Sequence, residues 1–248
     1  MKLSYAGTRY HGWQSQPNAV TVQETLEKAL SLILRMPIKI VGAGRTDTGV
    51  HATQMVAHFD TLKSINPEDL TYKLNSFLPQ DIAILEIKPV VPNAHARFDA
   101  QSRHYQYFIH QQKSPFLNAT SWELNRPLDL DAMNQAAKVL LSYTDFKSFS
   151  KTHTDVKTYI CDVQQAEWQV VNHQIVFKIT ADRFLRNMVR AIVGTLIQVG
   201  LHQLSFDDFK QIIEARDRNK AGFSVPAKGL FLTKITYSPK IFTAYGND

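Results

Sequence analysis

Hydrophobic spacing in the N-terminal half of the chain predicts alternating strands and helices. Apolar residues recur every three or four positions from Val22 to Leu34, which is typical of a helix with one buried face. Thr21 and Glu24 stand three residues apart at its start and predict a capping box, and Pro37 is expected to end the helix. The same reasoning predicts strands over residues 2–6, 38–41, 54–60, 81–87 and 95–110, and a second helix over residues 67–77.

The C-terminal half repeats this order of elements without visible sequence identity. The pattern predicts helices over residues 130–141 and 184–199, a hairpin over residues 157–180, a helix capped by Ser205, and a last strand over residues 230–237. We therefore predict an α+β fold of two similar lobes, residues 1–110 and 111–248, each with a mostly antiparallel sheet and flanking helices. The seam between such lobes is a natural cleft for a site.

The composition is that of an ordinary globular protein with a basic balance. Among 248 residues, 28 Lys and Arg outnumber 22 Asp and Glu, and the net charge of +6 favours a polyanionic partner without identifying it. The single cysteine, Cys161, excludes an internal disulfide framework and a multi-cysteine metal site. The first residues lack the apolar core of a signal peptide, and the apolar run over residues 188–201 is short and contains Arg190. We therefore expect a cytoplasmic protein without a membrane segment.

Asp47 is the residue on which the functional interpretation depends. It stands between Gly44 and Gly49, beside Arg45, and directly after the strand-like run of residues 38–41. Functional side chains concentrate in loops that a rigid strand positions. A carboxylate nucleophile beside a cation that binds phosphate suits covalent chemistry on a nucleic acid. The alternative is that Asp47 only caps a turn, because Asp and Gly favour turns for local backbone reasons.

Other motifs near Asp47 find little support. A dinucleotide-binding loop needs a third glycine where the chain has Asp47, and a phosphate-binding P-loop needs a Gly-Lys-Ser/Thr ending that is absent. Asp47, His51 and His58 match no known spacing of metal ligands, so we expect no metal and favour structural roles for both histidines. Catalysis by a Ser-His-Asp triad has no Gly-x-Ser-x-Gly elbow to support it.

Along nearly its whole length, the chain resembles the TruA family of tRNA pseudouridine synthases. The matching stretches, in the order of the family, are residues 12–17, 21–27, 44–52, 95–98, 103–107, 184–190, 221–222 and 229–230. The resemblance implies a pseudouridine synthase fold and an isomerase that converts uridine to pseudouridine in the anticodon stem-loop of tRNA, in the region of positions 38–40. It also implies a homodimer that needs no cofactor. The chain departs from the family at Ala6 and Thr144, where Asp and His are usual.

The resemblance supports Asp47 as the catalytic nucleophile and implies that Tyr105 and Leu230 lie in the site. Arg45 and Arg190 are candidates from their own chemistry. Arg45 either holds a phosphate or fills the space that the flipped uridine leaves. The alternative is that Arg45 is an ordinary surface arginine. Tyr105 stacks on the base, whereas Tyr107 fits a core position better. Arg190, in an apolar helix, pairs with Asp47 or with another acid, or extends to solvent. Leu230 forms an apolar wall or packs in the core.

Several basic residues are candidates for contact with the tRNA backbone, and they predict binding that weakens with salt. They are Arg9, Arg97, Arg103, Lys147, Lys151, Arg183 and Arg186. Two other functional classes remain open at this point. A non-catalytic RNA-binding module needs only the basic balance and the strand aromatics, and a metal-dependent hydrolase would lose activity to chelators. Asp47 favours an enzyme over the non-catalytic RNA-binding module, because a binding module does not need an anion that faces phosphates.

Overall fold

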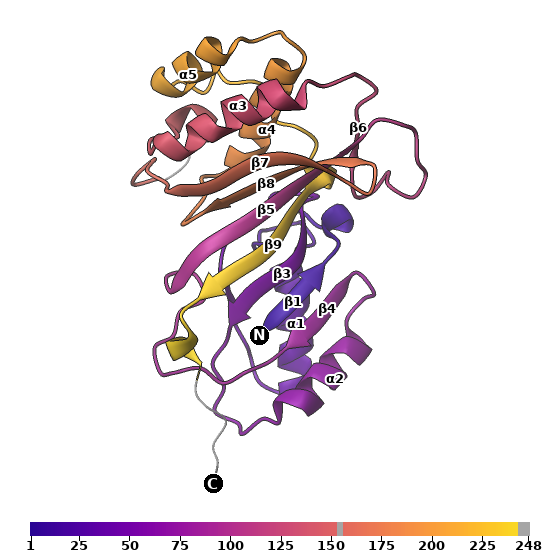
Figure 1. Cartoon of the computed structure of the whole chain (residues 1–248). Coiled ribbons are helices and arrows are strands. Elements are labelled where there is room, and N and C mark those ends of the chain that lie inside the picture. The colour runs from indigo at the N-terminus through magenta and orange to yellow at the C-terminus, as the bar shows by residue number, and fades with distance from the viewer. Residues whose placement is uncertain (153–155, 243–248) are drawn as a thin grey trace. The chain divides into compact units, whose positions relative to one another are not determined.

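The computed structural model describes residues 1–152 and 156–242, which form two compact units (Figure 1). Unit 1 comprises Met1–Gln101 and the chain from Leu232 onward, and unit 2 comprises Ser102–Phe231. The chain thus passes between the units near residues 101–102 and again near residues 231–232. The single lobe boundary expected after residue 110 stays a prediction.

Unit 1 is built on antiparallel strand pairs with two helices. Strand β1 pairs with both β3 and β4, the short β2 pairs with β3, and β9 neighbours β3, so the order is β4-β1-β3-β9. Helix α2 contacts α1 and β4. Leu3, Met55 and Leu26 are fully buried and form part of the core. The bounds are β1 Lys2–Tyr5, α1 Val22–Leu34, β2 Val41–Gly42, β3 His51–His58, α2 Pro67–Phe77, β4 Ile82–Glu86 and β9 Leu230–Tyr237.

Unit 2 combines an antiparallel sheet with a parallel two-residue strand. Strand β8 pairs antiparallel with β5 and β7, and β6 pairs parallel with the end of β5. Helix α3 contacts β7, α4 and α5. The β7–β8 hairpin turns at Asn172 and His173, whose φ values of 49° and 63° suit a tight turn with right-handed strand twist. The bounds are β5 Ala100–His110, β6 Trp122–Glu123, α3 Leu130–Val139, β7 Val163–Val171, β8 Gln174–Ala181, α4 Met188–Gly200 and α5 Phe206–Glu214.

The predicted α+β class is confirmed, and the strand pairing is mixed because the short β6 pairs parallel with β5. Short 3₁₀ helices add to the regular elements at Gly7–Arg9, Leu140–Ser142, Lys147–Phe149, Ala227–Gly229 and Pro239–Ile241. Two similar lobes with a cleft between them stay a prediction. In the described residues, the structure contains no helix that is both long and apolar enough to cross a membrane.

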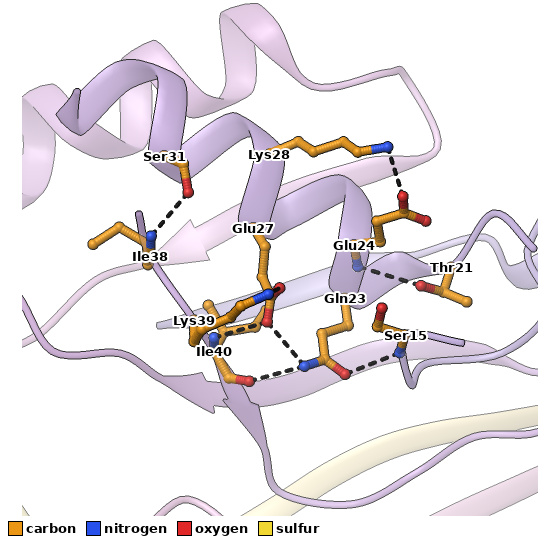
Figure 2. Close-up of polar contacts among 10 residues, drawn as sticks. All are labelled: Ser15, Thr21, Gln23, Glu24, Glu27, Lys28, Ser31, Ile38, Lys39 and Ile40. Atoms are coloured by element: carbon orange, nitrogen blue, oxygen red, sulfur yellow. Dashed lines mark hydrogen bonds and ion pairs between the residues drawn. The ribbon is translucent and has the colours of Figure 1, made fainter. Parts of the chain in front are cut away.

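The strand predicted over residues 38–41 is wrong for its first three residues. Ile38 and Ile40 are buried, as their alternation predicts, but only Val41 joins a strand. The reason is that side chains of α1 take the place of a strand partner. The Ile38 amide donates to Ser31 Oγ (2.9 Å), and the Ile40 amide donates to Glu27 Oε1 (3.1 Å; Figure 2).

Three predicted elements begin later than expected because turns precede them. The strand predicted from residue 95 begins at Ala100, since His95 Nδ1 accepts hydrogen bonds from the Arg97 and Phe98 amides in a turn. The helix predicted from residue 184 begins at Met188, after Asn187 in a left-handed conformation (φ 67°). The first strand of the hairpin begins at residue 163 rather than near 157.

The predicted helix caps differ in how completely they form. Thr21 Oγ1 accepts from the Glu24 amide (3.3 Å), but the Glu24 carboxylate pairs with Lys28 Nζ at 2.6 Å. The reciprocal capping box forms instead at α5, where Ser205 and Asp208 each bond the other's backbone. Helix α1 ends at Leu34, before Pro37, because Arg35 adopts a left-handed conformation with φ 52°.

Candidate active site

The Asp47 loop, residues 43–50, connects β2 to β3 in unit 1, as the strand-to-loop pattern predicts. Its side chains differ in exposure from one residue to the next. Arg45 is exposed, Thr46 is buried and Asp47 is half-buried. The loop therefore has an anchored backbone and offers a carboxylate and a guanidinium at its surface.

Backbone hydrogen bonds hold this loop against the segment that follows β1. The Trp13 amide donates to the Thr46 carbonyl at 3.1 Å, and the Gly49 amide donates to the Tyr10 carbonyl at 3.3 Å. Within the loop, the Val50 amide donates to the Asp47 carbonyl at 3.1 Å. These bonds fix the backbone on both sides of Asp47.

Buried side chains and close backbone approach add to this anchoring. The hydroxyls of Tyr5 and Thr46 lie 2.8 Å apart in the interior. A Cβ on Gly7 would collide with the Val50 carbonyl, so this approach requires glycine. The Gly7 amide donates to Nδ1 of the buried His51 at 3.1 Å. His51 thus helps to position the loop, in agreement with the structural role favoured for it.

His58, the second histidine with a predicted structural role, also forms a hydrogen bond with the backbone. Its Nδ1 accepts a hydrogen bond from the Ala96 amide at 3.0 Å, and its ring meets that of His95 edge-on at 4.9 Å. Burial, followed by the neighbouring His95, lowers the pKa of His58. Among the described residues, no three His, Cys, Asp or Glu side chains are grouped in a way that could hold a metal ion.

Tyr105 and Tyr107 occupy different environments on strand β5 of unit 2. Tyr105 is half-buried, and its ring meets Phe184 edge-on with centroids 5.1 Å apart. Tyr107 is fully buried and donates to the Pro226 carbonyl at 2.9 Å. Burial strongly raises the pKa of Tyr107, and the nearby Arg190 opposes that rise. Tyr107 is therefore a core residue, as expected, whereas Tyr105 has surface available for contact.

Arg190 lies in the third position of α4, also in unit 2, and is tied to the chain that precedes β9. Its Nε donates to the Val225 carbonyl at 2.7 Å, and its own carbonyl accepts from the Val225 amide at 3.3 Å. A Cβ on Gly194, one turn further along the helix, would collide with the Phe223 carbonyl. Arg190 is half-buried and Leu230 is buried. The pairing of Arg190 with Asp47 stays a prediction.

The predicted tRNA-contact residues include several with partners inside the protein. Arg9 pairs with Asp81 through Nε and Nη2, each 2.7 Å from Oδ2. Arg103 Nη1 donates to the Asp182 carbonyl at 2.7 Å. Cation–π contacts place Arg97 over Phe98 and Lys147 over Tyr159. Lys151, Arg183 and Arg186 lie in unit 2, where Arg183 is half-buried and the other two are exposed.

The polar residues on the face of α1 that contacts residues 38–40 are functional candidates that the sequence pattern did not predict. Glu27 is 7% exposed, although it lies between the apolar residues Leu26 and Ala29. Gln23 lies one turn earlier and donates to the Glu27 carboxylate. The sequence signal that could have identified them is an acid, Glu27, within an apolar helical stripe, with the side-chain amide of Gln23 four residues before it.

Comparison with known proteins gives a consistent result. A sequence profile of the family described as tRNA pseudouridine synthase matches residues 2–99 and 136–238. The proteins named tRNA pseudouridine synthase A of Parabacteroides distasonis and Bacteroides fragilis are 54% and 53% identical to this chain. In both cases the match covers 97% of this chain and 96% of the relative. The protein of the same name from Thermoanaerobacter pseudethanolicus is 42% identical over 95% of this chain and 97% of its own length.

Proposed function

Because the chain belongs to the tRNA pseudouridine synthase family, it is an isomerase, and we propose that it acts on the anticodon stem-loop of tRNA. In this proposal, the target uridines lie in the region of positions 38–40. Asp47 is the nucleophile, and the uridine leaves the stacked RNA to reach it. The single observation that supports this assignment is the half-buried Asp47 carboxylate on a loop whose backbone is bonded on both sides.

The reaction needs a group that assists cleavage of a carbon–nitrogen bond without changing the composition of the substrate. The N1–C1′ bond of uridine breaks, the uracil turns, and C5 bonds to the same sugar carbon. A proton leaves C5 and N1 gains one, so the product is an isomer. A carboxylate that attacks the sugar or the base divides this change into easier steps. Asp47 supplies this carboxylate in the proposal.

Fixed geometry favours Asp47 as the nucleophile over a simple turn cap. A reacting group that is held in place removes much of the entropic cost of bringing the reactants together. The Thr46 carbonyl and the Gly49 amide each bond to the segment of Tyr10–Trp13, so backbone bonds on both sides of Asp47 anchor the loop. A carboxylate carried on an anchored backbone suits the role of a nucleophile.

The other site residues receive roles that match their chemistry. Arg45 is exposed beside Asp47 and can hold a phosphate or fill the space that the extruded base leaves. Tyr105 supplies an aromatic surface, and stacking on a base contributes about 1–3 kcal/mol. Arg190 and Leu230 complete the proposed substrate-binding set, in which Leu230 forms an apolar wall for the uracil.

The proposal extends to the binding of tRNA and to assembly. The tRNA backbone contacts the basic residues that were named above as candidates. Two copies of the chain form the active homodimer, which acts in the cytoplasm. The proposed chemistry uses no cofactor. Relatives named tRNA pseudouridine synthase A support the choice of tRNA as the substrate.

Mapping pseudouridine in tRNA incubated with the purified protein tests the target site. Base-specific chemistry should detect pseudouridine within positions 38–40 of transcripts that carry uridine there, and none in matched transcripts with cytidine at those positions. Pseudouridine only in another arm of the tRNA would contradict the proposed target.

Replacing Asp47 with Ala separates an enzyme from a non-catalytic RNA-binding protein. We expect the variant to bind tRNA as the parent protein does, because the loop backbone is anchored by other residues, but to form no pseudouridine. Binding is measured by filter retention and product by the mapping described above. Product formation at the parent rate would rule out Asp47 as the nucleophile.

A further inference from the structure

Gln23, in the first turn of α1, bonds to both chain segments that flank the Asp47 loop (Figure 2). Its backbone amide donates to the Trp13 carbonyl at 3.0 Å, and its side-chain Oε1 accepts from the Ser15 amide at 3.1 Å. Its Nε2 donates to the Ile40 carbonyl at 3.1 Å and to Glu27 Oε1 at 3.0 Å. The side chain of Gln23 thus connects Ser15 with Ile40, and its backbone amide adds a bond to Trp13.

Glu27 completes this arrangement one helical turn later. Its Oε1 accepts from the Ile40 amide at 3.1 Å, and its Oε2 accepts from Lys39 Nζ at 2.8 Å. Burial alone would raise the pKa of Glu27, but hydrogen bonds from Lys39, the Ile40 amide and Gln23 outweigh it and hold that pKa below the usual range. A buried, ionised carboxylate therefore holds a backbone amide that would otherwise lack a strand partner.

The two segments held by α1 meet at the loop that carries Asp47. The Trp13 amide donates to the carbonyl of Thr46, which directly precedes Asp47. From Ile40 the chain continues through β2, where a Cβ on Gly42 would collide with the Trp13 indole ring. The Ala43 amide then donates to the Val56 carbonyl on β3 at 2.8 Å. Gln23 is thus linked to the Asp47 loop on one side through the backbone of Trp13 and on the other through the chain that runs from Ile40 into β2.

We propose that Gln23 and Glu27 are positioning residues for the reaction, their side chains acting through Ser15 and Ile40 on the segments beside the Asp47 loop to set the place of the Asp47 carboxylate. This inference rests on the proposed role of Asp47 as the nucleophile. A misplacement of a reacting group by about 1 Å can cost about a hundredfold in rate. Loss of these contacts therefore lowers the chemical rate more than it lowers the affinity for tRNA.

Variants of Gln23 and Glu27 test the inference in the full-length protein. Gln23→Met keeps the length of the side chain but removes its polar atoms, and Glu27→Met does the same for the carboxylate. Formation of the bond at C5 displaces the hydrogen there, so tritium release from C5-labelled uridine in tRNA measures the chemical step. The rate is measured in a single turnover with enzyme in excess, together with tRNA affinity by filter retention and thermal unfolding by circular dichroism.

We expect both methionine variants to slow tritium release by about tenfold or more, with tRNA affinity within about twofold of the parent. Glu27→Gln should recover most of the rate, because its amide oxygen still accepts from the Ile40 amide. The matched control is Lys28→Met, which removes the exposed ion-pair partner of Glu24 on the same helix and should leave the rate within about twofold.

Parent-like tritium release in Gln23→Met would overturn the inference, as would a loss of rate matched by an equal loss of tRNA affinity. Equal slowing by Glu27→Gln and Glu27→Met would also contradict it, because charge rather than the Ile40 contact would then matter. If Glu27→Met does not fold, Gln23→Met decides the question. Absence of tritium release by the parent protein would instead contradict the proposed function.

Discussion

A side chain at Gly12 would collide with the carbonyl oxygen of Thr46, the residue that directly precedes Asp47. Gly12 also has a φ of +86°, a conformation that residues with a Cβ rarely adopt. The next amide along the chain, that of Trp13, donates to the same Thr46 carbonyl. The lack of a side chain at Gly12 therefore allows the Asp47 loop to pack closely against the segment that contains Gly12 and Trp13.

Gly12→Ala should destabilise the protein and slow its reaction. The added methyl group meets the Thr46 carbonyl and the positive φ adds strain, so we expect a loss of about 1–3 kcal/mol in the free energy of unfolding. Urea denaturation measures this loss, and tritium release measures the rate. Gly44→Ala is the matched control, because a Cβ at Gly44 would have no atom within 4 Å. Equal stability of the two variants would contradict the importance of the Gly12–Thr46 approach.

The buried hydroxyls of Tyr5 and Thr46 should be energetically coupled. They lie 2.8 Å apart, and a typical internal hydrogen bond contributes about 0.5–1.5 kcal/mol net to stability. Tyr5→Phe, Thr46→Val and the double variant form a thermodynamic cycle measured by urea denaturation. We expect the double variant to lose less stability than the sum of the single variants. Strict additivity would show that this pair does not anchor the loop.

Stability should fall as the pH drops below the ordinary pKa of histidine, in part because of His58. Burial and the neighbouring His95 lower the pKa of His58, and its Nδ1 must stay unprotonated to accept from the Ala96 amide. The unfolded chain gains a proton near pH 6.5 that the folded protein does not, so this contribution is complete above pH 6.5 and is lost below it. Urea denaturation between pH 7.5 and 5 should show a shallower decline for His58→Gln. An identical pH dependence in both proteins would exclude this role.

Salt dependence of tRNA binding should identify cations that contact the phosphate backbone. Each phosphate contact adds roughly one to the slope of log affinity against log salt concentration. Arg186 is exposed in unit 2, and we expect Arg186→Ala to reduce that slope by about one. Arg216→Ala is a control, since Arg216 pairs with Asp145 at 3.0 Å and is not a predicted tRNA contact. An unchanged slope for Arg186→Ala would remove Arg186 from the proposed path.

The sequence predicted best those elements whose boundaries are set by local chemistry. Helix α2 spans Pro67–Phe77 as predicted, because Asn66 caps its first amides and Pro67 suits the first helical position. Strand β9 also has the predicted bounds, Leu230–Tyr237. The two-residue strand β6 was missed, since a segment so short has no period to detect.

The parts that sequence could not predict depend on contacts between distant residues. Ile38 and Ile40 have the alternation of a strand, yet their amides bond to Ser31 and Glu27 on α1. The Asp47 loop was predictable because glycines and charges are concentrated in a short run. The supports of that loop at Gly12 and Gln23 were not, because a backbone approach or a side-chain bond to a distant carbonyl leaves no local pattern.

The most direct test of the account compares Asp47→Asn with the parent protein in a single-turnover assay of tritium release from C5-labelled tRNA. The asparagine side chain keeps the size of aspartate but cannot act as an anionic nucleophile. We predict a fall of at least about a thousandfold, with tRNA affinity within about threefold, while the exposed Asp60→Asn control keeps the parent rate. Tritium release by Asp47→Asn at more than about a tenth of the parent rate would contradict the assignment of Asp47 as the nucleophile.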